Sequence, residues 1–337
     1  MWNGPRAEEG SPPVNRTGHT RPPPLEPKPD AQKWHPAAQR QILVERARIL
    51  SEIRRFFTER EMLEVETPLL AHGMVPEPHL EPIPCAGGFL HTSPEAAMKR
   101  LVAAGYGPVF QICRVFRADE SGPWHNPEFT MLEWYRPGWS LADLMAEVEE
   151  LVGCFIYSPP ARSLTWRELF IHYAHLDPFV VTREELMART ASPTTTLDKD
   201  GLLDLLLVEL IEPALVRENG LVFVTHFPAS RAAMAQIHPG PPPVALRCEL
   251  YVDGVELANG YQELTDSREQ RDRLEQANQQ RLAAGLAPLP MDEFFLTALE
   301  HGLPACAGVA LGIDRLVTLT LGLENIQQVL AFPGDRI

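Results

Sequence analysis

Apolar residues recur at helical spacing at the start of the patterned part of the chain. Five of them follow Gln41 and share one face of an amphipathic helix: Ile42, Ile49, Ile53, Phe56 and Phe57. A short strand follows at about residues 63–67 and stops at Pro68. Farther along, Ser93 can cap a helix that has Pro94 at its first position and runs to about Ala104. This stretch is therefore predicted as helix, strand, helix.

Two hairpins are predicted in the remaining pattern. Strand-like runs at residues 109–117 and 129–135 are joined by a polar loop rich in Gly, Pro and Asn, so we expect an antiparallel pair. A second hairpin is expected over residues 247–258, because Asp253-Gly254 lies between two valines and is a strong two-residue turn signal. Both hairpins favour antiparallel pairing.

The segment at about residues 158–220 departs from this strand pattern. Its first part has little periodicity and residues 202–216 are rich in Leu, so we expect a helical insertion. A capped, charged helix at 267–284 and a glycine-containing strand-to-helix segment at 308–322 follow. Strands separated by helices, with hairpins rather than βαβ spacing, indicate an α+β fold with a mostly antiparallel sheet flanked by helices.

Composition changes this picture at the front of the chain. Residues 1–35 combine many prolines with polar residues and have too few apolar groups to offset the entropy of ordering, so they are predicted to be a disordered tail. Residues 36–337 are left as the folded domain. A chain of 337 residues is long enough to bury a large core and to hold an active site.

The net charge and the spacing of the cysteines limit which partners and which compartment are expected. The net charge of −15 opposes sequence-independent binding to a phosphate backbone, so nucleic acid is disfavoured as a partner. The five cysteines have no CxxC pair and no zinc-finger spacing, which suits reduced thiols in the cytoplasm. No apolar stretch approaches the roughly 20 residues that cross a bilayer, and the N-terminus is unlike a signal peptide. We expect a cytoplasmic protein with no membrane association.

The first candidate site lies on the hairpin at residues 109–135. Phe129, Glu133 and Tyr135 share one face of a strand, because successive side chains alternate between the two faces. Arg117 ends the preceding strand, where its guanidinium could grip a phosphate held above the sheet. The alternative is that Phe129 is core and that Arg117 forms a surface ion pair with Asp119 or Glu120.

Two glutamates mark a second candidate site, for a metal ion. Glu256 and Glu263 are seven residues apart, which puts them on opposite faces of a regular strand. A bulge or kink at Asn259-Gly260 would bring them to one face. Paired carboxylates suit Mg²⁺, which is held by one or two carboxylates together with substrate phosphates. The alternative is a solvated pair of strand glutamates.

A third candidate site lies where a late strand becomes a helix, at residues 308–315. Its small residues would let a nucleotide approach the backbone, and Arg315 could stack on an adenine or neutralise a γ-phosphate. The segment does not end in the GKS or GKT of a Walker loop, and no GxGxxG follows a first βα unit.

Taken together, these segments resemble the class II aminoacyl-tRNA synthetases. Phe116-Arg117 with residues 125–135 is similar to their motif 2, residues 308–315 to motif 3, and residues 65–68 to the end of motif 1. The runs HNPEFTMLEWY and ELANGYQELTDSREQ resemble the lysyl enzymes. HTSPEAAMKRL, THFPAS and VALGIDRLVTL further resemble the elongation factor P lysine ligases, which are truncated lysyl-tRNA synthetase paralogues. The resemblance runs from about Gln41 to the C-terminus.

The resemblance implies an ATP-dependent ligase with a class II catalytic domain over residues 36–337. It implies ATP and Mg²⁺ as cofactors, β-lysine activated as its adenylate, a lysine of elongation factor P as the acceptor, and a homodimer formed through motif 1. Lysyl-tRNA synthetases have an anticodon-binding domain where this chain has the Pro-rich segment, so no tRNA is expected as a partner. The alternatives are an enzyme that charges tRNA or a small acceptor, and a regulatory paralogue without activity.

The resemblance also implies residue roles. Arg117 and Arg315 would be catalytic, and Glu256 and Glu263 would face the metal. The expected ATP contacts are Arg117, Asp119, Asn126, Phe129, Glu256, Leu257, Gly312 and Arg315. The expected contacts of the amino-acid substrate are Ser93, Pro94, Glu95, Glu133, Tyr135, Glu263 and Ala310.

Two positions depart from the family pattern. Asp119 stands where motif 2 has glutamate, so the contact with the ATP amino group would be made by its shorter side chain or by Glu120. Ala310 stands where lysyl-tRNA synthetases have glycine. One methyl group in a pocket changes discrimination by about 1–3 kcal/mol, enough to shift preference between α- and β-lysine.

Overall fold

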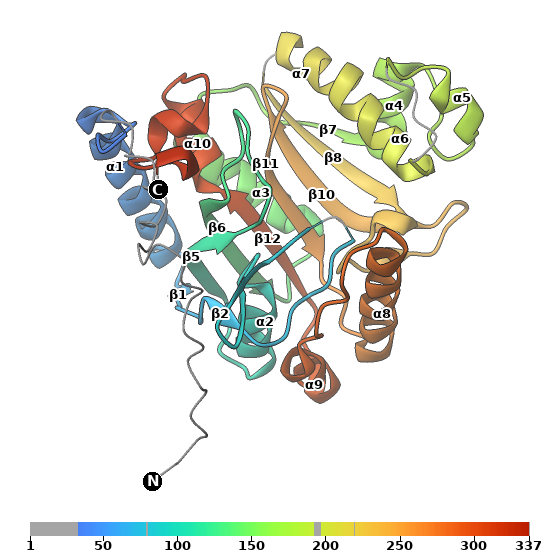
Figure 1. Cartoon of the computed structure of the whole chain (residues 1–337), viewed down its shortest axis with the longest axis horizontal. Helices are drawn as coiled ribbons and strands as arrows, with labels where there is room; N and C mark the ends of the chain where they lie inside the picture. The colour runs from blue at the N-terminus through green and yellow to red at the C-terminus, as the bar shows by residue number, and fades with distance from the viewer. Residues whose placement is uncertain (1–32, 79, 192–196, 219, 337) are drawn as a thin grey trace, which may run out of the picture. The chain divides into compact units, whose positions relative to one another are not determined.

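A nine-stranded sheet organises the described part of the chain (Figure 1). The computed structural model describes residues 33–78, 80–191, 197–218 and 220–336. Residues 36–335 belong to one compact unit, to which everything below refers. The predicted tail lies almost entirely outside the described residues, so that prediction is not tested.

The strands follow the order β1-β5-β6-β12-β11-β10-β8-β7, and β9 pairs with β10. Their bounds are β1 Leu63–Glu64, β5 Val109–Phe116, β6 Glu128–Pro137, β7 Arg162–Thr165, β8 Leu221–Pro228, β9 Ile237–His238, β10 Val244–Val252, β11 Val255–Gln262 and β12 Cys306–Gly312. A small separate sheet contains β2 Leu70–Ala71, β3 Ile83–Cys85 and β4 Gly88–Leu90.

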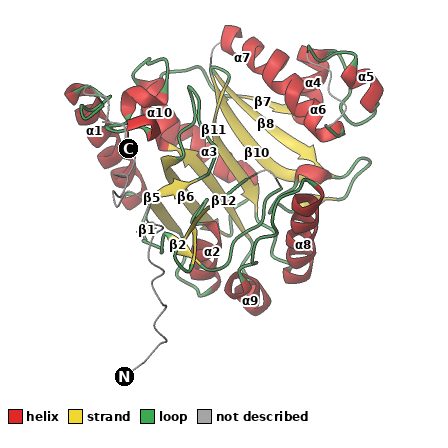
Figure 2. Ribbon diagram, in the orientation of Figure 1, coloured by secondary structure: helices red, strands yellow, loops and turns green. Residues whose placement is uncertain are grey.

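Helices flank both faces of the large sheet, as the secondary-structure colouring makes clear (Figure 2). The α-helices are α1 Arg40–Thr58, α2 Glu95–Ala103, α3 Leu141–Gly153, α4 Trp166–Ala174, α5 Arg183–Met187, α6 Lys199–Leu206, α7 Glu212–Glu218, α8 Ser267–Ala283, α9 Glu293–Gly302 and α10 Ile313–Thr320. Short η elements are the π-helix η1 Leu207–Ile211 and the 3₁₀ turns η2 Ala229–Arg231, η3 Ile326–Val329 and η4 Gly334–Arg336. None of the helices in the described ranges is long and apolar enough to cross a membrane.

The predicted α+β fold is confirmed. From β5 to β8 every neighbouring pair of strands is antiparallel, whereas the two edge pairs, β1 with β5 and β7 with β8, are parallel. Both predicted hairpins are present, and the turn between β10 and β11 has Asp253 and Gly254 at φ of 47° and 76°, the left-handed values that this tight turn requires. The helix predicted to begin at Pro94 begins one residue later, at Glu95, with Pro94 at its N-cap.

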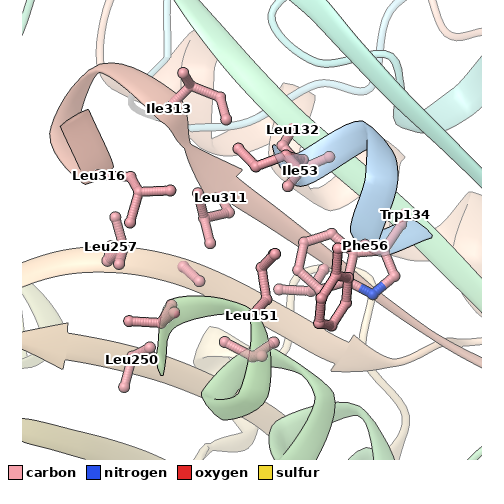
Figure 3. Packing of buried hydrophobic residues seen from close by; sticks show 14 of the residues in the cluster. Ile53, Phe56, Leu132, Trp134, Leu151, Leu250, Leu257, Leu311, Ile313 and Leu316 are labelled. Atoms are coloured by element: carbon pink, nitrogen blue, oxygen red, sulfur yellow. The ribbon is translucent and has the colours of Figure 1, made fainter. Parts of the chain in front are cut away.

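The apolar sides of three helices cover one face of the sheet. Side chains of α1, α3 and α10 pack on β6, β10, β11 and β12, with Ile53 and Phe56 of α1 and Leu151 of α3 among those in contact with the strands (Figure 3). Trp134 and Leu132 of β6 project into this core and are fully buried. Since residues alternate across a strand, this packing turns Glu133 and Tyr135 to the opposite face.

The second face is only partly covered. At one end, α2 and α9 pack together with Leu274 of α8 in a smaller apolar cluster. At the other end, α4, α6 and α7 pack against β8 and β10. The latter helices lie within residues 158–220, and their status as an insertion stays a prediction. The two clusters leave the middle of this face open for a cavity.

Candidate active site

A cavity of about 310 Å³ lies over the middle of the second face. Strands β6, β11 and β12 form its floor, while the N-terminus of α2 and the loop between β5 and β6 contribute to its walls. Its size and its mixture of apolar floor and convergent charges are typical of a small-ligand site. It contains most of the residues predicted from the three separated segments.

Strand register explains why these residues meet. Two cross-strand rows in the floor join β6, β12 and β11: Tyr135–Gly308–Tyr261 and Glu133–Ala310–Asn259. A third pairs Met131 of β6 with Gly312 of β12. The alternate residues Leu132, Trp134, Val309 and Leu311 face the opposite core. The cavity therefore exists because one register buries an apolar row on one side and exposes a polar row on the other.

The Gly308 position has no room for a side chain. A Cβ atom there would lie 2.4 Å from both the Tyr135 ring and the Glu263 carboxylate oxygen. Such contacts are far inside van der Waals distance. Glycine at this position lets Tyr135 and Glu263 approach each other above the floor.

Glu256 and Glu263 do face the same side, but not for the predicted reason. The ladder continues without a break through Asn259-Gly260, which pair with β10 on one side and β12 on the other. The register instead shifts between Leu250 and Tyr251 of β10. Leu250 pairs with Ala258 and Tyr251 pairs with Glu256, so Leu257 is an extra, unpaired residue on β11. This β-bulge changes the parity of the strand and turns Glu256 to the cavity. The predicted kink at Asn259-Gly260 is wrong.

The two predicted metal ligands are far apart along the strand, and their assignment to a metal stays a prediction. Glu256 lies near the start of β11 and Glu263 just past its end. At about 3.3 Å per residue, the two positions are on the order of 20 Å apart along the strand. One Mg²⁺ ion needs its ligands at about 2.0–2.1 Å, so these two carboxylates do not share an ion.

Glu263 lies at the acidic end of the cavity, and its nearest charged partner is a lysine that the sequence reasoning missed. Lys99 of α2 is 1% exposed, and its Nζ atom lies 2.5 Å from Glu263 Oε2 and 2.6 Å from Glu95 Oε1. Its spacing of four residues from Glu95 on one helix was a readable signal.

Glu133 is held at the same end by two hydroxyl groups. Ser93 Oγ donates to Glu133 Oε2 at 2.8 Å, and the Tyr135 hydroxyl donates to Glu133 Oε1 at 2.6 Å. Ser93 also accepts from the Glu95 backbone N–H at the start of α2. Pro94 does not line this cavity but borders a smaller neighbouring one. The predicted substrate residues, with that exception, are brought together.

Burial changes the protonation of these carboxyl groups. Loss of hydration raises the pKa of Glu133 to about 7, aided by the neighbouring charge of Glu95 and opposed by its two hydroxyl donors. Burial raises the pKa of Glu263 to about 8, although Lys99 opposes the change. A carboxyl group with a pKa near neutral releases its proton when a cation binds beside it.

The opposite end of the cavity presents two arginines. The Arg117 guanidinium lies 5.2 Å from the centre of the Phe129 ring and 3.4 Å from Glu120. Arg315 donates to the backbone oxygens of Glu256 at 2.6 Å and Trp124 at 3.2 Å, and contacts His125 Nε2 at 2.9 Å. His125 was not singled out from the sequence; burial, and then the positive charge of Arg315, lower its pKa.

Two predicted nucleotide contacts differ from expectation. Asp119 is exposed at a left-handed φ of 63° and does not line the cavity, whereas its neighbour Glu120 does. Asn126 lines the cavity, but its amide group already donates to Glu128 O and accepts from the Gly334 N–H. Leu257 and Gly312 line it as predicted, Leu257 being otherwise packed in the apolar core.

A second acidic group lies beside the arginine end. Glu249 of β10 pairs in register with Asn259, which makes it a diagonal neighbour of Glu256 on the same face. Burial raises the pKa of Glu249, and Glu256 adds to the rise. Burial raises the pKa of Glu212 on α7 to about 7, with Glu256 and Glu249 contributing. Within the described ranges, no three such side chains already form a metal-ligand cluster.

An antiparallel sheet that carries a cavity with arginines at one end and carboxylates at the other suits a ligase. In agreement, residues 32–336 match the family described as tRNA synthetases class II (D, K and N). The chain belongs to this family, which confirms the resemblance noted in its motifs.

Comparison with individual proteins gives a more specific similarity. The chain is 46% identical over 323 residues to "Elongation factor P--(R)-beta-lysine ligase" of Edwardsiella ictaluri (strain 93-146). The match covers 91% of this chain and 99% of the relative. The whole cavity described above lies within the family match, since its lining runs from Glu77 to Ile326.

The raised pKa of Glu133 predicts a pH-dependent stability. The folded-state pKa of about 7 exceeds the ordinary 4.5, so the folded state holds the proton more tightly and unfolding free energy falls as pH rises between these values. Each pKa unit is worth about 1.4 kcal/mol, which makes this contribution roughly 3 kcal/mol. In Glu133→Gln the fall in unfolding free energy between about pH 5 and pH 8 should be smaller by that order.

Denaturant unfolding of the ligand-free protein at several pH values measures this difference. Glu128→Gln is the matched control, because it makes the same change on the same strand at a side chain that is 41% exposed. The control should keep the wild-type slope. Equal slopes in wild type and Glu133→Gln would contradict the assignment.

Proposed function

We propose that this protein activates (R)-β-lysine with ATP and transfers it to a lysine side chain of elongation factor P. The observation that carries the proposal is the charge of the acidic end. Glu95, Glu133 and Glu263 converge there with Lys99 as their internal cation. With all three ionised, two negative charges are left for a ligand, which matches the two ammonium groups of a lysine isomer.

The name of the 46% identical relative supports the particular isomer and the acceptor. Ala310 adds support from within the cavity, because its methyl group narrows the floor between Glu133 and Asn259. A change of one methyl group shifts discrimination by about 1–3 kcal/mol. Ser93, Glu95, Glu133, Tyr135 and Glu263 would bind the amino acid.

At the other end, Arg117, Phe129 and Arg315 would bind ATP. Arg117 directly follows β5, Phe129 lies on the adjacent β6, and both line the cavity. Backbone carbonyls hold Arg315, which would face a phosphate or the adenine ring. Backbone groups of Leu257 and Gly312 line the space between. Glu120, which lines the cavity while Asp119 does not, would contact the adenine amino group.

Glu249 and Glu256 are the carboxylates that would face Mg²⁺: Glu256 lines the cavity, whereas Glu249 lies beside it, paired with Arg247 and accepting from the Tyr251 hydroxyl. They are close enough to raise the pKa of Glu212 jointly, and Glu256 raises that of Glu249. Two carboxylates, with the remaining positions filled by phosphate oxygens and water, suit the ion. Bound there, Mg²⁺ would offset the charge of the ATP phosphates.

The chemistry needs two displacements. The substrate carboxylate oxygen attacks the α-phosphorus, the bond to the bridging oxygen breaks, and pyrophosphate leaves while Arg117 and Arg315 stabilise the developing charge. The neutral amine of the acceptor lysine then attacks the adenylate carbonyl, loses a proton and expels AMP. The products are an amide, AMP and pyrophosphate.

The assembly and its compartment complete the proposal. A homodimer is supported by exposed apolar side chains beside the motif 1 segment, among them Leu63, Leu69 and Leu70. A cytoplasmic location is supported by five cysteines that form no disulfide.

Arg117→Ala tests the adenylation step. Loss of one guanidinium aimed at transition-state charge should slow ATP–pyrophosphate exchange by about 3–4 kcal/mol, or two to three orders of magnitude. Arg114→Ala is the matched control, because Arg114 lies on β5 shortly before Arg117, is exposed, and pairs at 3.5 Å with Glu128 outside the cavity. Near-normal exchange by Arg117→Ala would contradict the assignment.

The metal assignment is tested by the Mg²⁺ dependence of the same reaction. Glu249→Gln and Glu256→Gln should each need more Mg²⁺ for half-maximal exchange, because each loses a charged oxygen ligand. Glu263→Gln should instead raise the KM for the amino acid and leave the Mg²⁺ requirement unchanged. The reverse pattern would restore the original pairing of Glu256 with Glu263.

The acceptor is tested directly. Purified protein is incubated with ATP, Mg²⁺ and labelled α- or β-lysine, with either elongation factor P or tRNA present. We expect label in elongation factor P, more from β-lysine than from α-lysine, and none when the acceptor lysine is replaced by arginine. Label in tRNA would favour a charging enzyme, and no pyrophosphate exchange at all would favour a regulatory paralogue.

A further inference from the structure

Lys99 is buried among the very carboxylates that are proposed to bind the substrate. It projects from α2 beneath the acidic end of the cavity without lining it. Its Nζ atom bridges Glu95 and Glu263, at 2.6 Å and 2.5 Å. A third neighbour is Met234 Sδ at 4.0 Å, and the rings of Tyr135 and Phe295 lie within 6 Å. The ammonium group is thus held by charge on one side and by apolar or aromatic atoms on the other.

The burial of the Lys99 ammonium group has a free-energy cost. Removing an ammonium group from water costs several kcal/mol, and buried ion pairs seldom repay that cost in stability. A leucine or methionine in this place would pack against Phe295 and Met234 without it. The lysine is therefore better explained by what it does to Glu95 and Glu263 than by the stability of α2.

Several titratable groups face this cluster from the surrounding elements. They are Glu95 of α2, Glu133 and Tyr135 of β6, Tyr261 of β11, Glu263 after β11, Cys306 of β12, and Glu77 in the loop that borders the cavity. Phe295, the contact from α9, is uncharged. Lys99 is the cation that touches Glu95 and Glu263, and it also favours the ionised form of Glu133.

We propose that Lys99 is a positioning residue that sets the charge of the amine pocket: it fixes Glu95 and Glu263 from below and favours the ionised form of the carboxylates that would bind a dicationic substrate. The inference rests on the proposed function for the identity of that substrate. It predicts that Lys99 acts on substrate binding through the glutamates, without touching the substrate.

Lys99→Met removes the charge and keeps the length of the side chain. Without the ammonium group, Glu133 and Glu263 should ionise only at higher pH, so the pH at which (R)-β-lysine binding is half-maximal should rise by about one unit or more. Near neutral pH the KM in ATP–pyrophosphate exchange should then rise about tenfold, with a smaller change in kcat and recovery at higher pH. A residue that only packs would change neither the midpoint nor the KM recovery.

Two variants control this experiment. Lys99→Arg keeps the charge and should keep the wild-type pH midpoint. Lys199→Met makes the same change on α6, where the lysine contacts the Phe179 carbonyl outside the cavity, and should behave as wild type. An unchanged midpoint in Lys99→Met would overturn the inference. Failure of the wild type to bind any lysine isomer would instead overturn the proposed function.

A measurement on the wild-type protein is independent of how the variants fold. The chain has only four lysines, so ¹³C-labelled lysine gives few side-chain signals to assign. The Lys99 signal should respond as neighbouring carboxyls titrate between about pH 6 and pH 9, and its ammonium group should keep its proton past the ordinary pKa of about 10.4. If Lys99 shows neither behaviour and titrates like the other lysines, the inference is overturned.

Discussion

The register of the central antiparallel strands is the constraint on which the rest of the structure depends. Packing of α1, α3 and α10 buries Leu132, Trp134 and Leu311 on one face, and alternation then turns the polar residues of the same strands to the other. A slip of one residue would expose the apolar row and bury the glutamates. The hydrophobic core therefore positions the candidate active site from the opposite face of the sheet.

At the acidic end of the cavity, negative charge is concentrated where there is little hydration. Three glutamates and one lysine are held where hydration is poor, and the pKa values of Glu133 and Glu263 rise to about 7 and about 8 as a result. A ligand with two ammonium groups would relieve the repulsion that remains. The arginine end has the opposite charge: backbone carbonyl groups hold Arg315, and Arg117 lies beside the Phe129 ring. The two ends of the cavity therefore suit a cationic and an anionic group.

The corrections to the sequence predictions share a physical origin. A regular strand cannot bring Glu256 and Glu263 to one face, and the sequence pointed to glycine as the place of relief. The bulge instead forms at Leu257, where both Leu257 and Ala258 bury against the core. Bulge position is decided by which residues gain most from packing across the sheet, and that gain comes from α3 and α10, which are distant in sequence.

The sequence by itself determined the α+β class and the two hairpins, because local periodicity and turn chemistry are properties of neighbouring residues. The resemblance of its motifs gave the family and about half of the residues that line the cavity. Only the tertiary structure decided which carboxylates work together. Glu256 is a diagonal neighbour of Glu249 across a strand pair, and Glu263 forms an ion pair with Lys99 on a helix 164 residues earlier in the chain. Charge pairing depends on distances between elements, and those distances are set by packing, which no local pattern records.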